Sequence, residues 1–257
     1  MLEDGIKRMD KTEIDKIMGV VDHTLLKPYA KEKEVKKLID EAASLKTYSV
    51  CIHPLFAKAA KRYITKKGYS LKIAVTIDFP MGVLTTNSRA KALKSLAKDI
   101  NEADFVVQMG YVKSKKFNLV QKDVNKLVDV AHQNNIVIKF IVEDAYTTKE
   151  EKEKLYEIVC GSKADFIKTS TGFAEAEYSS SLGNKVGADP ENVKLMAETI
   201  KRLGSKTGIK TSGGIHTYSQ VLDLLKASGK SLDPKEFRLG MSGTRKLYEE
   251  LEKLKSN

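Results

Sequence analysis

The sequence has no tryptophan, only two cysteines and five prolines, and no long apolar run among its 257 residues. Cys51 and Cys160 are too few for a disulfide framework, and neither lies in a Cys/His cluster of the kind that holds zinc. No stretch approaches the ~18 apolar residues of a membrane-spanning helix, and the N-terminus has acidic residues instead of an apolar signal segment. We therefore expect no metal, no membrane partner, and free thiols in the cytoplasm.

Negative charge is also scarce, because 45 Lys and Arg face 34 Asp and Glu, which gives a net charge of +11. A basic chain can bind nucleic acid, and this is one hypothesis for its function. The lysines lie mostly in runs of mixed sign, such as residues 31–37 and 149–157, which are typical of solvated helix faces. Since no basic–aromatic motif accompanies them, we expect no nucleic-acid partner.

Short apolar, β-branched segments alternate along the chain with charged segments of helical periodicity. The strands expected from this pattern are residues 19–26, 48–54, 71–80, 103–110, 136–143, 164–171, 208–215 and 237–242. The clearest helices are residues 34–45, 120–133, 191–203 and 218–227, and residues 11–18 predict a short extra helix before the first strand. Residues 175–189 lie between a strand and a helix and are expected to form a long loop.

Eight strand–helix units in about 250 residues are typical of an α/β protein with the (β/α)8 TIM-barrel fold. The alternative, a doubly wound sheet, usually has a G-x-G-x-x-G turn after its first strand, whereas DHTLLKP follows here and contains no glycine. We expect one barrel domain over residues 1–257. In such barrels the chemistry lies at the carboxyl ends of the strands and in the loops that follow them.

Three lysines lie inside expected strands 5, 6 and 7, namely Lys139, Lys168 and Lys210. Burial of an ammonium group is costly and lowers its pKa, and a second ammonium nearby lowers it further. A lysine amine that is free at neutral pH can attack a carbonyl and form a Schiff base. The three lysines therefore predict a nucleophile with its activator, and we expect low pKa values for Lys168 and Lys210.

Asp104 lies at the start of the expected fourth strand, among apolar residues. A buried carboxylate requires a partner, and the lysine cluster would provide one. Two interpretations remain open. Asp104 is a general acid and base that moves protons, or the strand lysines merely form ion pairs with acids such as Asp104, Glu143 and Asp165.

Glycine and serine follow the last two expected strands, in TSGGIHT (211–217) and LGMSGTRK (239–246). In barrels these two loops often bind phosphate through backbone N–H groups, and glycine lets the backbone approach the anion closely. The TSTG run (169–172) would add further donors. The residues expected at this phosphate site are Gly213, Gly214, Gly240, Ser242 and Gly243.

Over about residues 17–250 the chain resembles the deoxyribose-phosphate aldolases, which are class I (Schiff-base) aldolases. The motifs that carry the resemblance are DHTLLKP (22–28), VCIHP (50–54), EADFVVQMG (102–110), KFIVE (139–143), FIKTSTGF (166–173), IKTSGGI (209–215) and RLGMSG (238–243). The resemblance implies reversible cleavage of 2-deoxy-D-ribose 5-phosphate to acetaldehyde and D-glyceraldehyde 3-phosphate. It also implies that no cofactor is required and that the chain forms a homodimer or homotetramer.

The same resemblance implies a role for each site residue. Lys168 would form the Schiff base, Lys210 would depress the pKa of Lys168, and Asp104 would transfer protons. The implied substrate-binding residues are Asp22, Cys51, Lys139, Thr171, Gly172, Gly213, Gly214, Gly240, Ser242 and Gly243.

Three positions depart from the family pattern. Gln108 stands where asparagine is usual, His216 where arginine is common, and Gly243 where a second serine often occurs. All three bear on phosphate affinity more than on the type of reaction. His216 and the long 175–189 segment also motivate an alternative, in which the same Schiff-base chemistry acts on another phosphosugar, as in other aldolases or transaldolases.

Overall fold

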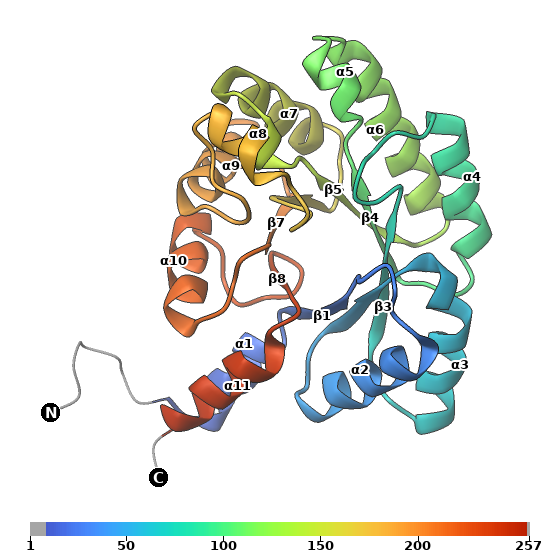
Figure 1. Cartoon of the computed structure of the whole chain (residues 1–257), viewed down its shortest axis with the longest axis vertical. Helices are drawn as coiled ribbons and strands as arrows, with labels where there is room; N and C mark the ends of the chain where they lie inside the picture. Colours follow the sequence, from blue (N-terminus) through green and yellow to red (C-terminus); the bar gives the residue numbers. More distant parts are fainter. Residues whose placement is uncertain (1–8, 256–257) are drawn as a thin grey trace, which may run out of the picture.

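The structure, a computed structural model, describes residues 9–255. Eight parallel strands pair in chain order, and β8 pairs with β1, so that the sheet closes into a barrel surrounded by helices (Figure 1). The strands are β1 (Val21–Leu25), β2 (Ser49–Ile52), β3 (Lys72–Ile77), β4 (Glu102–Val106), β5 (Val137–Ile141), β6 (Phe166–Lys168), β7 (Gly208–Ser212) and β8 (Phe237–Met241). The predicted (β/α)8 barrel is confirmed, and each strand overlaps its expected range.

Helices follow the strands around the barrel. They are α1 (Lys11–Met18), α2 (Glu32–Ser44), α3 (Ala57–Lys67), α4 (Thr86–Leu96), α5 (Met109–Lys113), α6 (Phe117–Gln133), α7 (Lys149–Gly161), α8 (Ala176–Ser181), α9 (Pro190–Arg202), α10 (Tyr218–Ser228) and α11 (Thr244–Lys253). Two short 3-10 helices, η1 (Pro54–Phe56) and η2 (Asp144–Tyr146), follow β2 and β5. Within residues 9–255, none of the helices combines the length and the apolar character that a membrane crossing requires.

The predicted extra helix before the first strand is α1, and its bounds are those expected. Asp10 and Glu13 form a capping box at its start, which satisfies backbone N–H groups that a helix end leaves free. Its apolar face is buried through Ile14, Ile17 and Met18. In Figure 1 the helix lies beside α11, so that the first and last helices of the barrel pack together.

Residues 175–189 contain a helix, α8, so the prediction of a loop throughout this segment was wrong. Tyr178 of α8 packs edge-on against Tyr146, with 5.5 Å between the ring centroids. Further along, the Asn184 amide donates hydrogen bonds to the backbone oxygens of Ala145 and Thr147, at 3.1 and 2.9 Å. These contacts hold the segment against the connection between β5 and α7.

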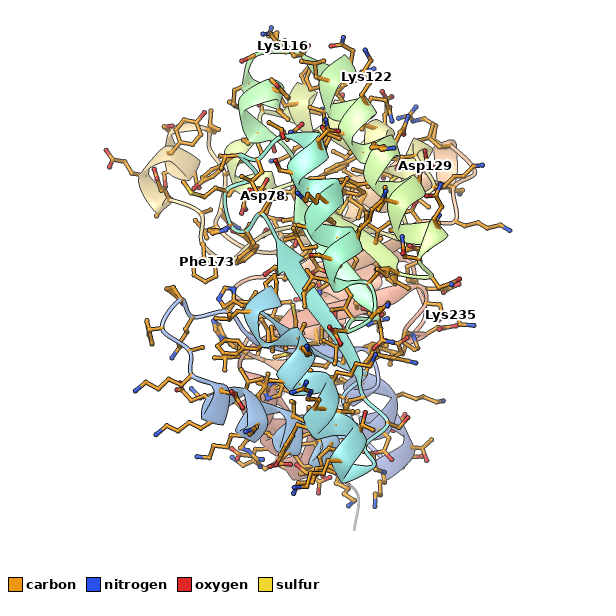
Figure 2. The ribbon with its side chains drawn as sticks, turned by 90° about the vertical axis from the view of Figure 1, so that its right-hand side faces the viewer. Asp78, Lys116, Lys122, Asp129, Phe173 and Lys235 are labelled. Carbon is orange, nitrogen blue, oxygen red and sulfur yellow. The ribbon has the colours of Figure 1, made fainter. Side chains whose placement is uncertain are left out.

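A buried arginine joins α4 to α6 and to the loop after β3. Arg89 is fully buried, and its Nη1 lies 2.5 Å from Asp123 Oδ2 of α6. Its Nε lies 3.6 Å from Asp78, whose carboxylate accepts hydrogen bonds from the backbone N–H groups of Val83 and Leu84. Asp78 lies at the carboxyl end of β3, at the end of the barrel that also bears Phe173, whereas Lys235 lies at the opposite end (Figure 2).

We expect Arg89→Ala to lower the free energy of unfolding by about 3–5 kcal/mol, because it leaves the buried Asp123 carboxylate without its countercharge. The measurement is urea unfolding followed by circular dichroism. Arg202→Ala is the matched control, since Arg202 pairs with Glu157 on the surface and its loss should cost less than about 1 kcal/mol. Equal effects of the two substitutions would contradict this account of the fold.

Candidate active site

The barrel interior is charged. Seven Asp, Glu, Lys and Arg side chains from six strands are at most 3% exposed, and several of them pair across the barrel with strands that are not neighbours in the sheet. Their side chains therefore project into the interior and not outward to the helices. They are Asp22 (β1), Glu102 and Asp104 (β4), Lys139 (β5), Lys168 (β6), Lys210 (β7) and Arg238 (β8).

Six of these side chains form a closed ring in which acids and cations alternate. The Nζ atom of Lys210 lies 2.5 Å from Asp22 Oδ2 and 2.8 Å from Asp104 Oδ2. On the other side of Asp104, the Nζ atom of Lys139 lies 2.9 Å from Asp104 Oδ1 and 2.6 Å from Glu102 Oε2. Asp104 is thus held between two lysines from different strands.

Arg238 closes the ring. Its Nη1 lies 2.7 Å from Asp22 Oδ1, and its Nη2 lies 2.9 Å from Glu102 Oε1. The guanidinium also stacks on the ring of Tyr48, 3.5 Å from the ring centroid, and Ser49 donates a hydrogen bond to Asp22 Oδ1. Each acid of this interior ion-pair ring therefore meets two cations of the ring, and each cation meets two acids.

Lys168 is the seventh charged group and stands outside the ring. Its Nζ lies 2.8 Å from Asp104 Oδ2, the same oxygen that Lys210 contacts. Since the ring holds three carboxylates and three cations, a protonated Lys168 is a surplus positive charge in a buried site. The pKa of Lys168 is lowered, first by burial and then by the charge of Lys210, although the Asp104 carboxylate opposes the shift.

The other two strand lysines behave differently from Lys168, and the prediction of a low pKa for Lys210 was wrong. Burial lowers the pKa of Lys210, but the carboxylates of Asp104 and Asp22 outweigh burial and raise it. Lys139 also has a raised pKa, because Asp104 and Glu102 overcome its burial. Lys168 is consequently the one of these three lysines whose ammonium group loses its proton most readily, and Lys210 stays a cation beside it.

The sequence suggested that Asp104 lies at the start of the fourth strand, but it lies in the middle of β4. Burial alone would raise the pKa of its carboxyl group, but Lys139, Lys168 and Lys210 together hold that pKa well below its usual value. Asp104 is therefore a stable carboxylate that touches all three lysines.

The other acids named in the ion-pair alternative do not pair with these lysines. The Asp165 carboxylate contacts His132, 3.1 Å away. Glu143 accepts hydrogen bonds from the backbone N–H and the hydroxyl of Thr171. The strand lysines are therefore ion-paired, but their partners are the carboxylates inside the barrel, namely Asp22, Glu102 and Asp104.

A cavity of about 380 Å³ opens above Lys168 at the carboxyl ends of the strands. Its walls come from the loops that follow β1, β6, β7 and β8. The predicted residues that line it are Lys168, Thr171, Gly172, Gly213, Gly214, Gly240 and Ser242.

Three glycines pack closely against one another at the wall of the cavity. Gly172 and Gly213 have φ angles of 82° and 86°, in the left-handed region that favours glycine. A Cβ atom on Gly187 would lie 2.6 Å from the backbone oxygen of Gly213, which also accepts a hydrogen bond from the N–H of Ala188 at 3.0 Å. The segment around Gly187 thus supports the Gly213 loop from outside.

Four residues predicted to bind the substrate do not line the cavity, namely Asp22, Cys51, Lys139 and Gly243. Asp22 and Lys139 lie in the ion-pair ring beneath it. Cys51 is buried in a small apolar cluster with Leu26 and Ala74, and burial raises the pKa of its thiol.

Two of the departures from the family pattern lie near each other. Gly243 precedes α11 and is not in the lining, while His216 lines the cavity. A Cβ atom on Gly243 would lie 3.9 Å from His216 Nδ1. The third, Gln108, lies away from the cavity and donates a hydrogen bond to the backbone oxygen of Leu84.

Sequence reasoning missed three residues at the site, and it named a fourth, Glu143, only as a possible ion-pair partner of the strand lysines. Glu102 and Arg238 give the same signal as the strand lysines, a charged residue within an apolar strand, but were not singled out. Glu143, whose own backbone φ is 45°, accepts a hydrogen bond from the N–H of Thr171. Lys27 lines the cavity from the loop after β1. Among residues 9–255, no three His, Cys, Asp or Glu side chains converge into a possible metal site.

Comparison with known proteins agrees with this geometry. Residues 16–250 match the family model of the DeoC/LacD family aldolases. A deoxyribose-phosphate aldolase of Thermoplasma volcanium is 50% identical over 95% of this chain and 97% of its own length. A crystal structure from Coccidioides immitis superposes with a TM-score of 0.82 at 26% identity, covering 93% of this chain and 87% of that one.

The fold is also that of a deoxyribose phosphate aldolase structure from Aeropyrum pernix, with a TM-score of 0.77 at 24% identity over 96% of this chain and 94% of that one. Fold and family match together make this protein a (β/α)8-barrel aldolase, a carbon–carbon lyase. The chain belongs to the DeoC/LacD family of aldolases.

The charge pattern of the interior predicts which lysine reacts with small electrophiles. We expect trace acetylation with acetic anhydride to modify Lys168 with a midpoint below the ordinary lysine pKa of 10.5, because its ammonium form is disfavoured. Lys139 and Lys210 should stay unmodified at that pH, because their ammonium forms are stabilised. Peptide mass spectrometry across a pH series measures all three, and preferential labelling of Lys210 would contradict the assignment.

Proposed function

We propose that the chain cleaves 2-deoxy-D-ribose 5-phosphate reversibly to acetaldehyde and D-glyceraldehyde 3-phosphate through a Schiff base on Lys168. The observation that carries the proposal is the position of Lys168. It is the one lysine of the interior cluster that lines the cavity, and its charge is the one that the ring leaves unbalanced. A free amine at the floor of a cavity, beside a permanent cation, is what imine formation requires.

The reaction begins when the Lys168 amine attacks the C1 aldehyde carbon of the open-chain sugar. A proton delivered to the carbinolamine hydroxyl through Asp104 lets that oxygen leave as water and gives an iminium ion. This ion restores a positive charge next to Asp104, where the carboxylate already lies within 2.8 Å of the amine. The developing charge thus forms in a site that holds its counterion in place.

Cleavage follows as the C2–C3 bond breaks and its electron pair flows into the iminium. The C3 hydroxyl loses its proton and becomes the aldehyde of glyceraldehyde 3-phosphate, and the two-carbon enamine stays on Lys168. Protonation of the enamine at its terminal carbon and hydrolysis release acetaldehyde. Asp104 Oδ2 contacts both Lys168 and Lys210, so we assign it the exchange of protons between these groups and the reacting atoms.

The phosphate would lie at the glycine-rich side of the cavity. Gly213, Gly214 and Ser242 offer backbone N–H groups and a hydroxyl there, which are the donors that bind phosphate in barrels. Lys27 and His216 line the same cavity, and the ammonium group of Lys27 provides the positive charge that a departure from the usual arginine would otherwise remove.

Three coarser features complete the proposal. Residues 1–257 act as one catalytic domain. The chain forms a homodimer or homotetramer, for which the support is the tetramer described for the Aeropyrum pernix aldolase. The protein works in the cytoplasm, in keeping with the free and buried state of both cysteines.

Borohydride reduction in the presence of acetaldehyde should leave an ethyl group on Lys168, found by peptide mass spectrometry. Lys168→Ala should lower kcat/KM for deoxyribose 5-phosphate by about a thousandfold or more, because it removes the covalent route. Lys122→Ala, on the exposed face of α6, is the control and should keep full activity. An unmodified Lys168, or higher turnover of ketose phosphates than of deoxyribose 5-phosphate, would refute the proposal.

Gly187→Ala should raise KM for deoxyribose 5-phosphate about tenfold or more while leaving acetaldehyde trapping on Lys168 unchanged. The new methyl group collides with the Gly213 oxygen and displaces the Gly213 loop. The charge-assisted hydrogen bonds of this loop to the anion contribute about 1–3 kcal/mol. Gly183→Ala is the matched control, because Gly183 has a similar φ of 71° but no atom near its would-be Cβ. An equal rise in KM for both variants would show that backbone strain, and not the collision, is responsible.

A further inference from the structure

Glu102 and Arg238 form the far side of the interior ion-pair ring, away from the cavity. They are 1% and 1% exposed and bind each other through Glu102 Oε1 and Arg238 Nη2, 2.9 Å apart. Glu102 continues to Lys139, and Arg238 continues to Asp22. Neither residue lines the cavity or has a hydrogen bond or ion pair with Lys168 among the described interactions, so the proposed chemistry gives them no task.

The groups that do face Lys168 come from four elements. Asp104 of β4 and Lys210 of β7 touch or oppose it directly, Cys51 of β2 acts on its charge, and Glu143 after β5 lies close enough for its own pKa to respond to Lys168. Asp104 and Lys210 are both members of the ring. Any change in the charge of the ring is therefore transmitted to Lys168 through residues it already contacts.

We propose that Glu102 and Arg238 are positioning residues that act on the charge state of Lys168 from a distance as a balanced pair, because each cancels the effect of the other on the net charge of the ring beneath it. This inference rests on the proposed role of the Lys168 amine and adds to it the source of its reactivity. With three carboxylates and three cations in the ring, the free amine is the form of Lys168 that leaves the barrel interior without net charge. Loss of either remote residue would therefore change the net charge of the ring, and the two losses would change it in opposite directions.

Removal of the acid gives the ring a net positive charge. In Glu102→Gln the three cations keep only two carboxylates, and Lys139 then draws more strongly on Asp104. The ammonium form of Lys168 becomes less favourable, so its amine should become reactive at lower pH. The shift should be about one pH unit, at the low end of the ~1–3 units that a charge in direct contact produces.

Removal of the cation gives the ring a net negative charge. In Arg238→Gln three carboxylates face only Lys139 and Lys210, and a protonated Lys168 supplies the missing charge. Its amine should then become reactive only at higher pH, again by about one unit. The double variant Glu102→Gln/Arg238→Gln loses one charge of each sign, and its neutral ring should return the midpoint to that of the unmodified protein.

The experiment is the pH midpoint of Lys168 acetylation by acetic anhydride, measured by peptide mass spectrometry in the full chain and its variants. We expect a lower midpoint for Glu102→Gln, a higher one for Arg238→Gln, and restoration in the double variant. Glu151→Gln is the control, because Glu151 pairs with Lys113 outside the barrel, and it should leave the midpoint unchanged. Circular dichroism confirms that each variant is folded.

Loss of packing alone would move both single variants in the same direction and would not be restored by the double variant, so that result, or an absence of shifts, would overturn the inference. If one single variant does not fold, the other single variant and the double variant still decide the sign and the restoration. Acetylation does not depend on aldol chemistry. A protein that shows the opposed shifts but forms no reduced adduct with acetaldehyde would refute the proposed function instead.

Discussion

Charge balance inside the barrel is the constraint on which the site depends. Seven ionisable groups are buried where an apolar core would be at least as stable, since desolvation of ion pairs costs about as much as their attraction returns. The alternating ring keeps that cost tolerable by giving every acid and every cation two partners of opposite sign. What remains is one lysine whose proton has no place in the balance, and this lysine lies on the floor of the cavity.

The closed barrel is what makes such a ring possible. Asp22 on β1 meets Lys210 on β7, and Glu102 on β4 meets Arg238 on β8, although these strands are not neighbours in the sheet. Only a sheet that curves through a full turn brings their inward side chains together. The register of the strands sets the height of these side chains in the barrel. The backbone of Lys168 lies opposite that of Lys210, and the backbone of Lys210 lies opposite that of Arg238, on adjacent strands.

Much of this could be predicted from the sequence. The eight strand–helix units identified the barrel because periodicity is local, and charged residues inside apolar strands are rare enough to mark a site. The pairing of Asp104 with the lysine cluster was predicted and is confirmed. The pairing of Lys210 with Asp22 could not be predicted, because it joins residues 188 positions apart. For the same reason the sequence suggested a low pKa for Lys210, since it shows the burial of a lysine but not the Asp22 carboxylate that compensates it together with Asp104.

Helix α8 was missed because its six residues are mostly serine and alanine with little apolar periodicity, and its position depends on the contact of Tyr178 with Tyr146. The segment that contains it is fastened to the backbone oxygens of Ala145, Thr147 and Gly213, and also to the side chains of Tyr146 and Lys152. Backbone anchors do not depend on which side chains the neighbouring loops carry. The support of the Gly213 loop therefore constrains the sequence less than the charged layer beneath the cavity does, because in that layer each ion pair joins two side chains.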